Sequence, residues 1–166
     1  MRPTIRSITV SMALVLAAAA AQAGGSVQVS FVQPEKFSDV RDAQLSSVSN
    51  LRELKRHLEE LGARHVADAQ SLTIEVLDVD LAGEIRFSRG WHENVRVLRD
   101  SADWPRIKLR VTLESADQPV QRVEQTVSDM AYLQRINRYR DGELLRHEKH
   151  MLDAWFEAQF AGAAAR

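Results

Sequence analysis

The sequence predicts an α+β fold in which a mainly antiparallel sheet of about four or five strands has helices packed on one face. Several short segments alternate apolar and polar residues, which is typical of half-buried strands. Two longer segments instead have apolar residues at helical spacing. Residues 107–113 and 123–127 are two alternating segments joined by a short polar loop, and they indicate an antiparallel hairpin. A doubly wound parallel sheet is disfavoured because it needs a helical crossover between most strands.

The N-terminal segment has the organisation of a cleaved secretory signal. Two arginines precede an apolar run, and the small-x-small triplet Ala21-Gln22-Ala23 follows it. The run is shorter than the roughly 20 residues of a membrane span. We therefore expect a cleaved signal peptide at 1–23, a single α+β domain at 24–166 and no membrane span after cleavage. An uncleaved N-terminal anchor is the alternative.

Composition limits the function classes. The chain has no cysteine, so no disulfide supports an exported domain and its apolar core must do so. The net charge of −1 becomes −3 when the two arginines of the signal are removed, and no block of like charge is present. A nucleic-acid partner is therefore not expected.

The first strand is predicted where Val27, Val29 and Phe31 alternate with polar residues. Pro34 follows, and because proline has no N–H for a sheet ladder we expect the strand to end before it. The remaining strands are predicted over residues 72–77, around Val95 and Val97, and in the 107–113/123–127 hairpin.

The first helix is predicted from an apolar stripe that runs from Val48 to Leu61 at spacings of three and four. Asn50 and Glu53 have the spacing of a capping box near its start. Gly62 is expected to loosen or end it.

A second long helix is predicted near the C-terminus. Asp141 is a good N-cap residue, and the apolar periodicity that follows extends to Phe160. Residues 130–139 are expected to form a further short helical segment.

The stretch LDVDLAGE at residues 77–84 contains three carboxylates, namely those of Asp78, Asp80 and Glu84. Counted from Asp78, the first and third positions are aspartates, as in a calcium loop. The fifth position is Ala82 and the twelfth is Arg89, where oxygen ligands are required. Neither a phosphate loop nor a dinucleotide-binding motif is present. We therefore predict no metal site and no cofactor.

Asp78 and Asp80 have the same parity as the apolar residues at 72–76, so in a regular strand both point toward the covered face. Buried carboxylates there need an arginine, backbone N–H groups or a metal. We favour a structural role in which the acids fix the turn at Gly83. A carboxylate ligand site is the alternative.

Glu148 falls inside the apolar stripe of the second helix, on the same side as Met151 and Trp155. A carboxylate in that position is costly unless it is paired. We expect a structural salt bridge to an arginine of the sheet, and a functional carboxylate is the alternative. His147 and His150 flank the solvent side and are interpreted as an incidental surface pair.

Six segments in this order resemble the bacterial domain-of-unknown-function family 3016, a family of small secreted proteins. The segments are VSFVQPEKFSDV (29–40), LTIEVLDVDLAGE (72–84), NVRVL (94–98), DWPRIKLRVTL (103–113), SDMAYL (128–133) and HEKHMLDAWF (147–156). The resemblance implies an exported, periplasmic protein of a Gram-negative bacterium. It supplies no catalytic residues.

The leading functional hypothesis is a non-enzymatic binding or protein-interaction domain of the cell envelope, with an unidentified protein or ligand as its partner. It follows from the lack of a complete nucleophile system or metal-ligand set. One alternative is a hydrolase or metal-dependent enzyme that uses a cluster of Asp78, Asp80 and Glu148, and a metal or small-ligand carrier is another. The candidate residues of a ligand site or buried polar network are Asp78, Asp80, Glu84, Asp103, Arg106 and Glu148. The enzyme hypothesis predicts that these side chains converge on one pocket.

Overall fold

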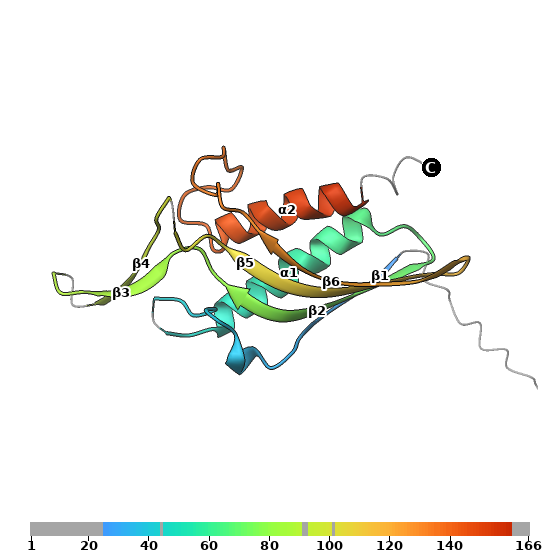
Figure 1. Cartoon of the computed structure of the whole chain (residues 1–166), viewed down its shortest axis with the longest axis horizontal. Coiled ribbons are helices and arrows are strands. Elements are labelled where there is room, and N and C mark those ends of the chain that lie inside the picture. The colour runs from blue at the N-terminus through green and yellow to red at the C-terminus, as the bar shows by residue number, and fades with distance from the viewer. Residues whose placement is uncertain (1–24, 44, 91–92, 101, 161–166) are drawn as a thin grey trace, which may run out of the picture.

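Four strands form the main sheet, in the order β1-β2-β5-β6 (Figure 1). Their bounds are Ser26–Phe31 for β1, Gln70–Asp80 for β2, Arg106–Ser115 for β5 and Gln118–Ser128 for β6. This computed structural model describes residues 25–43, 45–90, 93–100 and 102–160. The β2, β5 and β6 strands pair antiparallel, and β1 pairs parallel with β2. The predicted α+β class with a mainly antiparallel sheet is confirmed. The predicted signal peptide lies outside the described residues.

Helix α1 (Val48–His65) connects the two parallel strands β1 and β2. Gly62 was expected to loosen or end this helix, and the helix does not end there, because it continues to His65. A Cβ atom at Gly62 would lie 2.6 Å from Val27 Cγ1, so glycine is needed where α1 crosses β1. The predicted capping box is also wrong: Asn50 is buried within the helix, and its Nδ2 donates to the Val40 carbonyl.

Helix α2 begins at Arg146 and ends at Phe160. Asp141 is therefore not its N-cap. Instead its carboxylate, which is 94% exposed, pairs with the Arg146 guanidinium. The predicted helical segment at 130–139 is wrong as well, since these residues form turns and bends.

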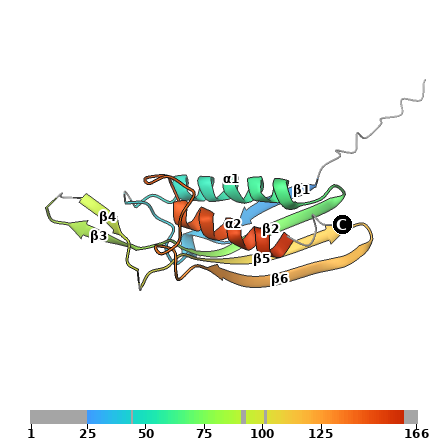
Figure 2. The same ribbon diagram turned by 90° about the horizontal axis from the view of Figure 1, so that it is seen from above.

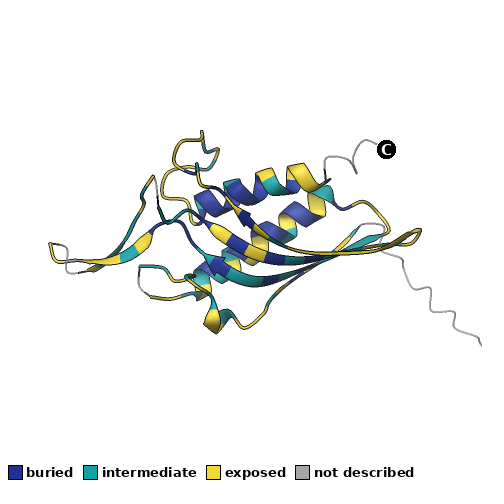
Figure 3. Ribbon diagram, viewed as in Figure 1, coloured by how far each residue is buried: buried dark blue, intermediate teal, exposed yellow. Residues whose placement is uncertain are grey.

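The two helices lie side by side against one face of the sheet (Figure 2). Buried residues gather where the helices meet β2 and β5, whereas most of β6 is exposed (Figure 3). The centre of this core consists of Leu54, Leu58, Leu61, Leu72, Ile74, Val76, Ile107, Leu109, Leu152 and Phe156. Each of these side chains is at most 1% exposed, so the apolar stripes of the sequence correctly identify the core.

A β-bulge in β2 decides where the acids of LDVDLAGE point. The pairing of β2 with β5 shifts between Val76 and Asp78, so Leu77 is an extra residue without a partner. Beyond the bulge Val79 faces the core opposite Ile107, and Asp78 and Asp80 face the open side of the sheet. The expectation that both acids point toward the covered face is therefore wrong, because a one-residue shift exchanges the two faces.

Strands β3 (Glu84–Ser88) and β4 (Glu93–Val97) form a separate hairpin that projects from the end of the main sheet (Figures 1 and 2). The β4 strand was predicted, but β3 was not. Gly83 leads into the hairpin with a φ of 79°, and a Cβ there would lie 2.5 Å from the Val97 carbonyl oxygen. None of the helices that the structure describes combines the length and the apolar character needed to cross a membrane.

Candidate functional site

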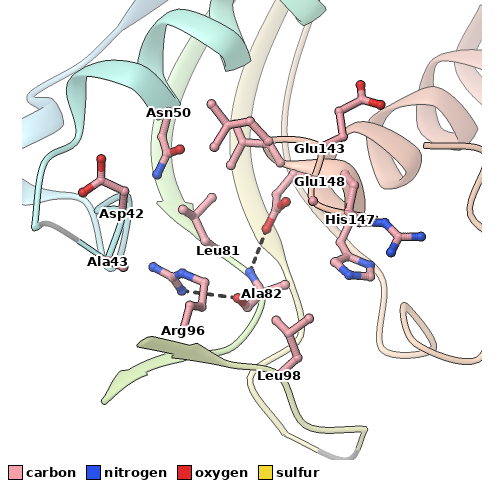
Figure 4. Close-up of a pocket in the computed structure, with 14 residues that line it drawn as sticks. Asp42, Ala43, Asn50, Leu81, Ala82, Arg96, Leu98, Glu143, His147 and Glu148 are labelled. Atoms are coloured by element: carbon pink, nitrogen blue, oxygen red, sulfur yellow. Dashed lines mark hydrogen bonds between the residues drawn. The ribbon is translucent and has the colours of Figure 1, made fainter. Parts of the chain in front are cut away.

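A cavity of about 320 Å³ lies where four segments of the chain meet (Figure 4). These segments are residues 42–43 together with Asn50 in the first turn of α1, the turn after β2 at 81–82, residues 96–98, and residues 142–148 at the start of α2. The apolar part of its wall consists of Ala43, Leu81, Ala82, Leu98, Leu144 and Leu145. We call this cavity the Glu148 pocket. Its volume and mainly apolar wall are typical of small-ligand sites.

Glu148, in the first turn of α2, is the buried carboxyl group of this pocket. The residue is 3% exposed, and its Oε1 accepts the Ala82 N–H at 2.7 Å. Among the described residues no lysine, arginine or histidine forms a salt bridge with it, so the predicted pairing with a sheet arginine is wrong. Burial raises the pKa of Glu148, and the N–H bond from Ala82 offsets this only in part. A titratable group shifted in this way within a cavity is a candidate functional residue.

Arg96 of β4 lies on the other side of the Ala82 turn (Figure 4). Its Nη1 donates to the carbonyls of Ala82 and Gly83 at 3.3 and 3.0 Å. Its Nη2 donates to Asp39 Oδ2 at 2.9 Å and to the Arg41 carbonyl at 2.6 Å. Because both Nη atoms bind two protein oxygens each, Arg96 holds the turn and the hairpin together and is not free to neutralise Glu148.

Asn50 contributes an unpaired acceptor to the pocket wall. The residue is 2% exposed, and because Nδ2 donates to the Val40 carbonyl at 3.1 Å, the oxygen Oδ1 is the atom left without a partner. Its amide points toward Leu81 in Figure 4. A buried acceptor without a donor costs free energy that a bound donor would recover.

His147 also lines the pocket, contrary to its interpretation as a surface residue. It is 9% exposed, and its ring meets Tyr132 edge-on at 5.0 Å between centroids. Burial lowers the pKa of His147, and the positive charge of Arg146 acts in the same direction. The imidazole is therefore neutral at neutral pH, with an unpaired Nδ1.

Asp78 and Asp80 lie outside the Glu148 pocket. Asp78 accepts the N–H and the hydroxyl of Ser38, each at 2.7 Å, and so fixes the loop that follows β1. Asp80 pairs with Arg106 on the open face of the sheet, with Nε at 3.1 Å. Both carboxylates thus accept hydrogen bonds from neighbouring polar groups of the protein.

Glu84 and Asp103 lie at the base of the β3–β4 hairpin, where both bind Arg99. Glu84 also accepts from Arg86 at 2.9 Å. Among the six predicted site residues, only Glu148 lines the pocket. The convergence that the enzyme hypothesis predicts is therefore not found, and the described residues contain no group of three His, Asp or Glu that could hold a metal ion.

Sequence reasoning missed a buried polar network between the helices. Lys149 is 2% exposed and binds Glu53 at 3.1 Å and Glu143 at 2.5 Å. Asp153 accepts from His57 at 3.1 Å and from the Tyr139 hydroxyl at 2.7 Å. The available signal was the matching spacing of four between Glu53 and His57 on one helix and between Lys149 and Asp153 on the other.

Comparison with known proteins gives a family. No curated protein matches the chain. A family model described as protein of unknown function (DUF3016) matches residues 25–158, which span both helices and all six strands apart from the last two residues of α2. The predicted resemblance is thereby confirmed over most of the chain, and the protein belongs to the DUF3016 family.

Proposed function

We propose that this protein is an exported, non-enzymatic binding protein of the cell envelope, and that its ligand occupies the Glu148 pocket. The observation that carries this proposal is the pocket itself. Its apolar walls enclose the carboxyl group of Glu148, which lacks a cationic partner among the described residues, and the unpaired Oδ1 of Asn50. An apolar cavity with a few convergent polar groups is the usual form of a small-ligand site.

The polar groups of the pocket favour binding over catalysis. Acyl or phosphoryl transfer needs donors aimed at the developing negative charge. The Nη atoms of Arg96 already bind four protein oxygens, so they supply no such donors. The pocket also lacks a serine or threonine beside His147, and the described residues that line it include no lysine.

Export is supported by the sequence. The N-terminal segment combines two arginines, a short apolar run and an Ala-x-Ala site. The family match starts just after the predicted cleavage point. A family match that begins after the cleavage point is expected for a folded domain that follows a removable signal peptide.

Export is tested by expressing the full chain in a Gram-negative host and releasing the periplasm by osmotic shock. We expect the protein in the shock fluid, with the mass of a chain whose first residue is Gly24. Full-length protein that starts at Met1 and stays with the membranes or the cytoplasm would contradict the proposal.

Binding is tested by screening small cationic, neutral and anionic compounds for a rise in melting temperature, since a ligand that binds only the folded state stabilises it. Leu144→Trp places a large side chain at the pocket wall. Leu133→Trp is the matched control, because Leu133 is similarly exposed, at 39% against 42%, and does not line the pocket. We expect hits that Leu144→Trp abolishes and Leu133→Trp retains. Hits that survive Leu144→Trp, or turnover of a compound at this site, would contradict the proposal.

A further inference from the structure

The Glu148 pocket presents two buried oxygen acceptors that lack a full set of donors. The carboxylate of Glu148 accepts a hydrogen bond from the backbone N–H of Ala82, and a carboxylate has capacity for several. The Oδ1 of Asn50 receives none. A ligand that satisfies both atoms must therefore carry N–H or O–H donors.

Most of the charged residues that line the pocket are paired with an opposite charge, and Asp42 is bound by neutral donors. Arg96 and Asp39 bind each other at 2.9 Å, Glu143 binds Lys149 at 2.5 Å, and Arg146 binds Asp141. Asp42 accepts from the N–H of Ser46 and the hydroxyl of Ser49. Among the described residues that line the pocket, Glu148 is thus the one buried carboxyl group without a counterion, which makes its ionised form costly.

The ligand head that fits these facts is a cation with several donors in a small volume. An ammonium group has three N–H donors and a full positive charge, so it can bind Glu148 and Asn50 together. The walls formed by Leu81, Leu98 and Leu145 are apolar and suit a hydrocarbon chain behind that head.

We propose that the Glu148 pocket binds the ammonium group of an unbranched alkylamine, either as a free amine or as the side chain of a lysine on another molecule. This inference rests on the proposed function. The ammonium contacts the Glu148 carboxylate and Asn50 Oδ1, and the alkyl chain lies against the leucine side chains.

Binding is coupled to a proton. The carboxyl group of free Glu148 faces Ala82, with Arg96 and Asp39 across the turn and neutral His147 next to it in the sequence, and burial raises its pKa above the ordinary value. An alkylammonium ion and protonated Glu148 give the ion pair and one released proton. Affinity for the amine should therefore fall as the pH is lowered through the pKa of Glu148.

The test uses titration calorimetry with n-pentylammonium, 1-pentanol and n-hexanoate, which share a five-carbon chain and differ in the head group. NMR shifts of the Ala82 amide and of the Leu81 and Leu98 methyl groups locate the binding. We expect pentylammonium to bind at least about tenfold more tightly than the alcohol, as charge-assisted hydrogen bonds allow, and hexanoate to bind most weakly. Nα-acetyl-lysine methylamide distinguishes the two sources, since a pocket for protein lysines binds it as tightly as the free amine.

Glu148→Gln keeps the shape and an acceptor for Ala82 and removes the charge. We expect it to weaken pentylammonium binding by about tenfold or more and to leave pentanol binding unchanged. Asp80→Asn is the matched control outside the pocket and should have no effect. In the wild-type protein, which needs no variant to fold, amine affinity should fall as the pH is lowered through the folded pKa of Glu148, which is raised above 4.5.

Equal affinity for the alcohol and the amine, or amine affinity that does not change with pH, would overturn the inference while leaving a binding function in place. If a compound of another chemical class binds this pocket and none of the three probes does, the amine inference is likewise overturned and a binding function stays in place. If no compound of any class shifts the pocket signals, the proposed function itself is overturned.

Discussion

Glu148 and Arg96 bind the same residue from opposite sides. The carboxyl of Glu148 accepts the Ala82 N–H at 2.7 Å, and the guanidinium of Arg96 donates to the Ala82 carbonyl at 3.3 Å. One contact joins α2 to the turn after β2, and the other joins the β3–β4 hairpin to that turn. The turn inside LDVDLAGE is thus the point at which helix, sheet and hairpin are tied together.

Replacement of Glu148 should separate its hydrogen bond from its charge. Glu148→Ala leaves the buried Ala82 N–H without an acceptor, so we expect the free energy of unfolding to fall by about 1–3 kcal/mol. Glu148→Gln retains an acceptor and removes the cost of burying a charge, so at neutral pH it should be at least as stable as the wild type. Urea denaturation of both variants measures these values. A Gln variant as unstable as the Ala variant would show that the charge itself is needed.

The pH dependence of stability should show the raised pKa of Glu148. Above its ordinary value of 4.5, the folded carboxyl stays protonated after the unfolded one has lost its proton. The folded state then binds more protons, so this group lowers the free energy of unfolding as the pH rises through that window. The difference between Glu148→Gln and the wild type should therefore grow with pH and level off above the folded pKa. Denaturation of both proteins at a series of pH values measures it, and a constant difference would contradict the prediction.

Asp153 should contribute in the opposite direction. Burial alone would raise the pKa of Asp153, but hydrogen bonds from His57 and Tyr139 outweigh it and lower the pKa below the ordinary value of 3.8. Its contribution to stability is therefore present at neutral pH and lost as the pH falls through the folded pKa. Asp153→Asn should weaken the acid dependence of unfolding that the wild type shows below about pH 4, as circular dichroism would measure. An unchanged acid transition would assign that dependence to other carboxylates.

Loss of the buried Lys149 should be costly. Lys149→Met leaves Glu53, with an 18% exposed side chain, and Glu143 without their shared cation, and we expect a loss of about 2–3 kcal/mol. Lys108→Met is the control, because its 2.7 Å pair with Glu124 is exposed and should be worth less than about 1 kcal/mol. Adding Glu53→Gln to Lys149→Met should recover part of the loss. Equal effects of the two lysine substitutions would contradict the buried role.

Gly62 should be intolerant of a side chain although it lies in a helix. Alanine normally stabilises a helix interior by about 1 kcal/mol relative to glycine. At Gly62 the added Cβ would lie 2.6 and 2.8 Å from the two methyl groups of Val27, so Gly62→Ala should be destabilising. Val27→Ala should relieve the contact, so the double variant should lose less stability than the two single losses combined. Thermal unfolding of the four proteins measures this coupling, and simple additivity would contradict it.

The elements that could be predicted were those with a local periodicity. The stripe from Val48 to Leu61 and the alternation over 107–113 identified α1 and β5, because each pattern is complete within one element. The β3 strand was not predicted, although Ile85 and Phe87 alternate with polar residues and β3 has the same length as the predicted β4. The prediction that Asp78 and Asp80 point toward the covered face was wrong because a bulge cannot be recognised in a hydrophobic pattern.

The candidate site was predicted at one residue. The position of Glu148 within an apolar stripe showed that its carboxyl is buried. Its hydrogen-bond partner could not be predicted, because Ala82 lies 66 positions away in the sequence. The donor is also a backbone N–H, which every residue except proline has. Asn50 was assigned to a helix cap because local spacing could not reveal that the Val40 carbonyl occupies its amide.

The sequence by itself determined the fold class, the family and the burial of Glu148, because periodicity and composition decide which side chains leave water. The tertiary structure alone decided which groups meet. The bulge at Leu77 moved two acids away from the helices, and the turn at Ala82 placed a backbone N–H against Glu148. Contacts of this kind depend on register and chain crossing, which are properties of the whole sheet and not of any one segment.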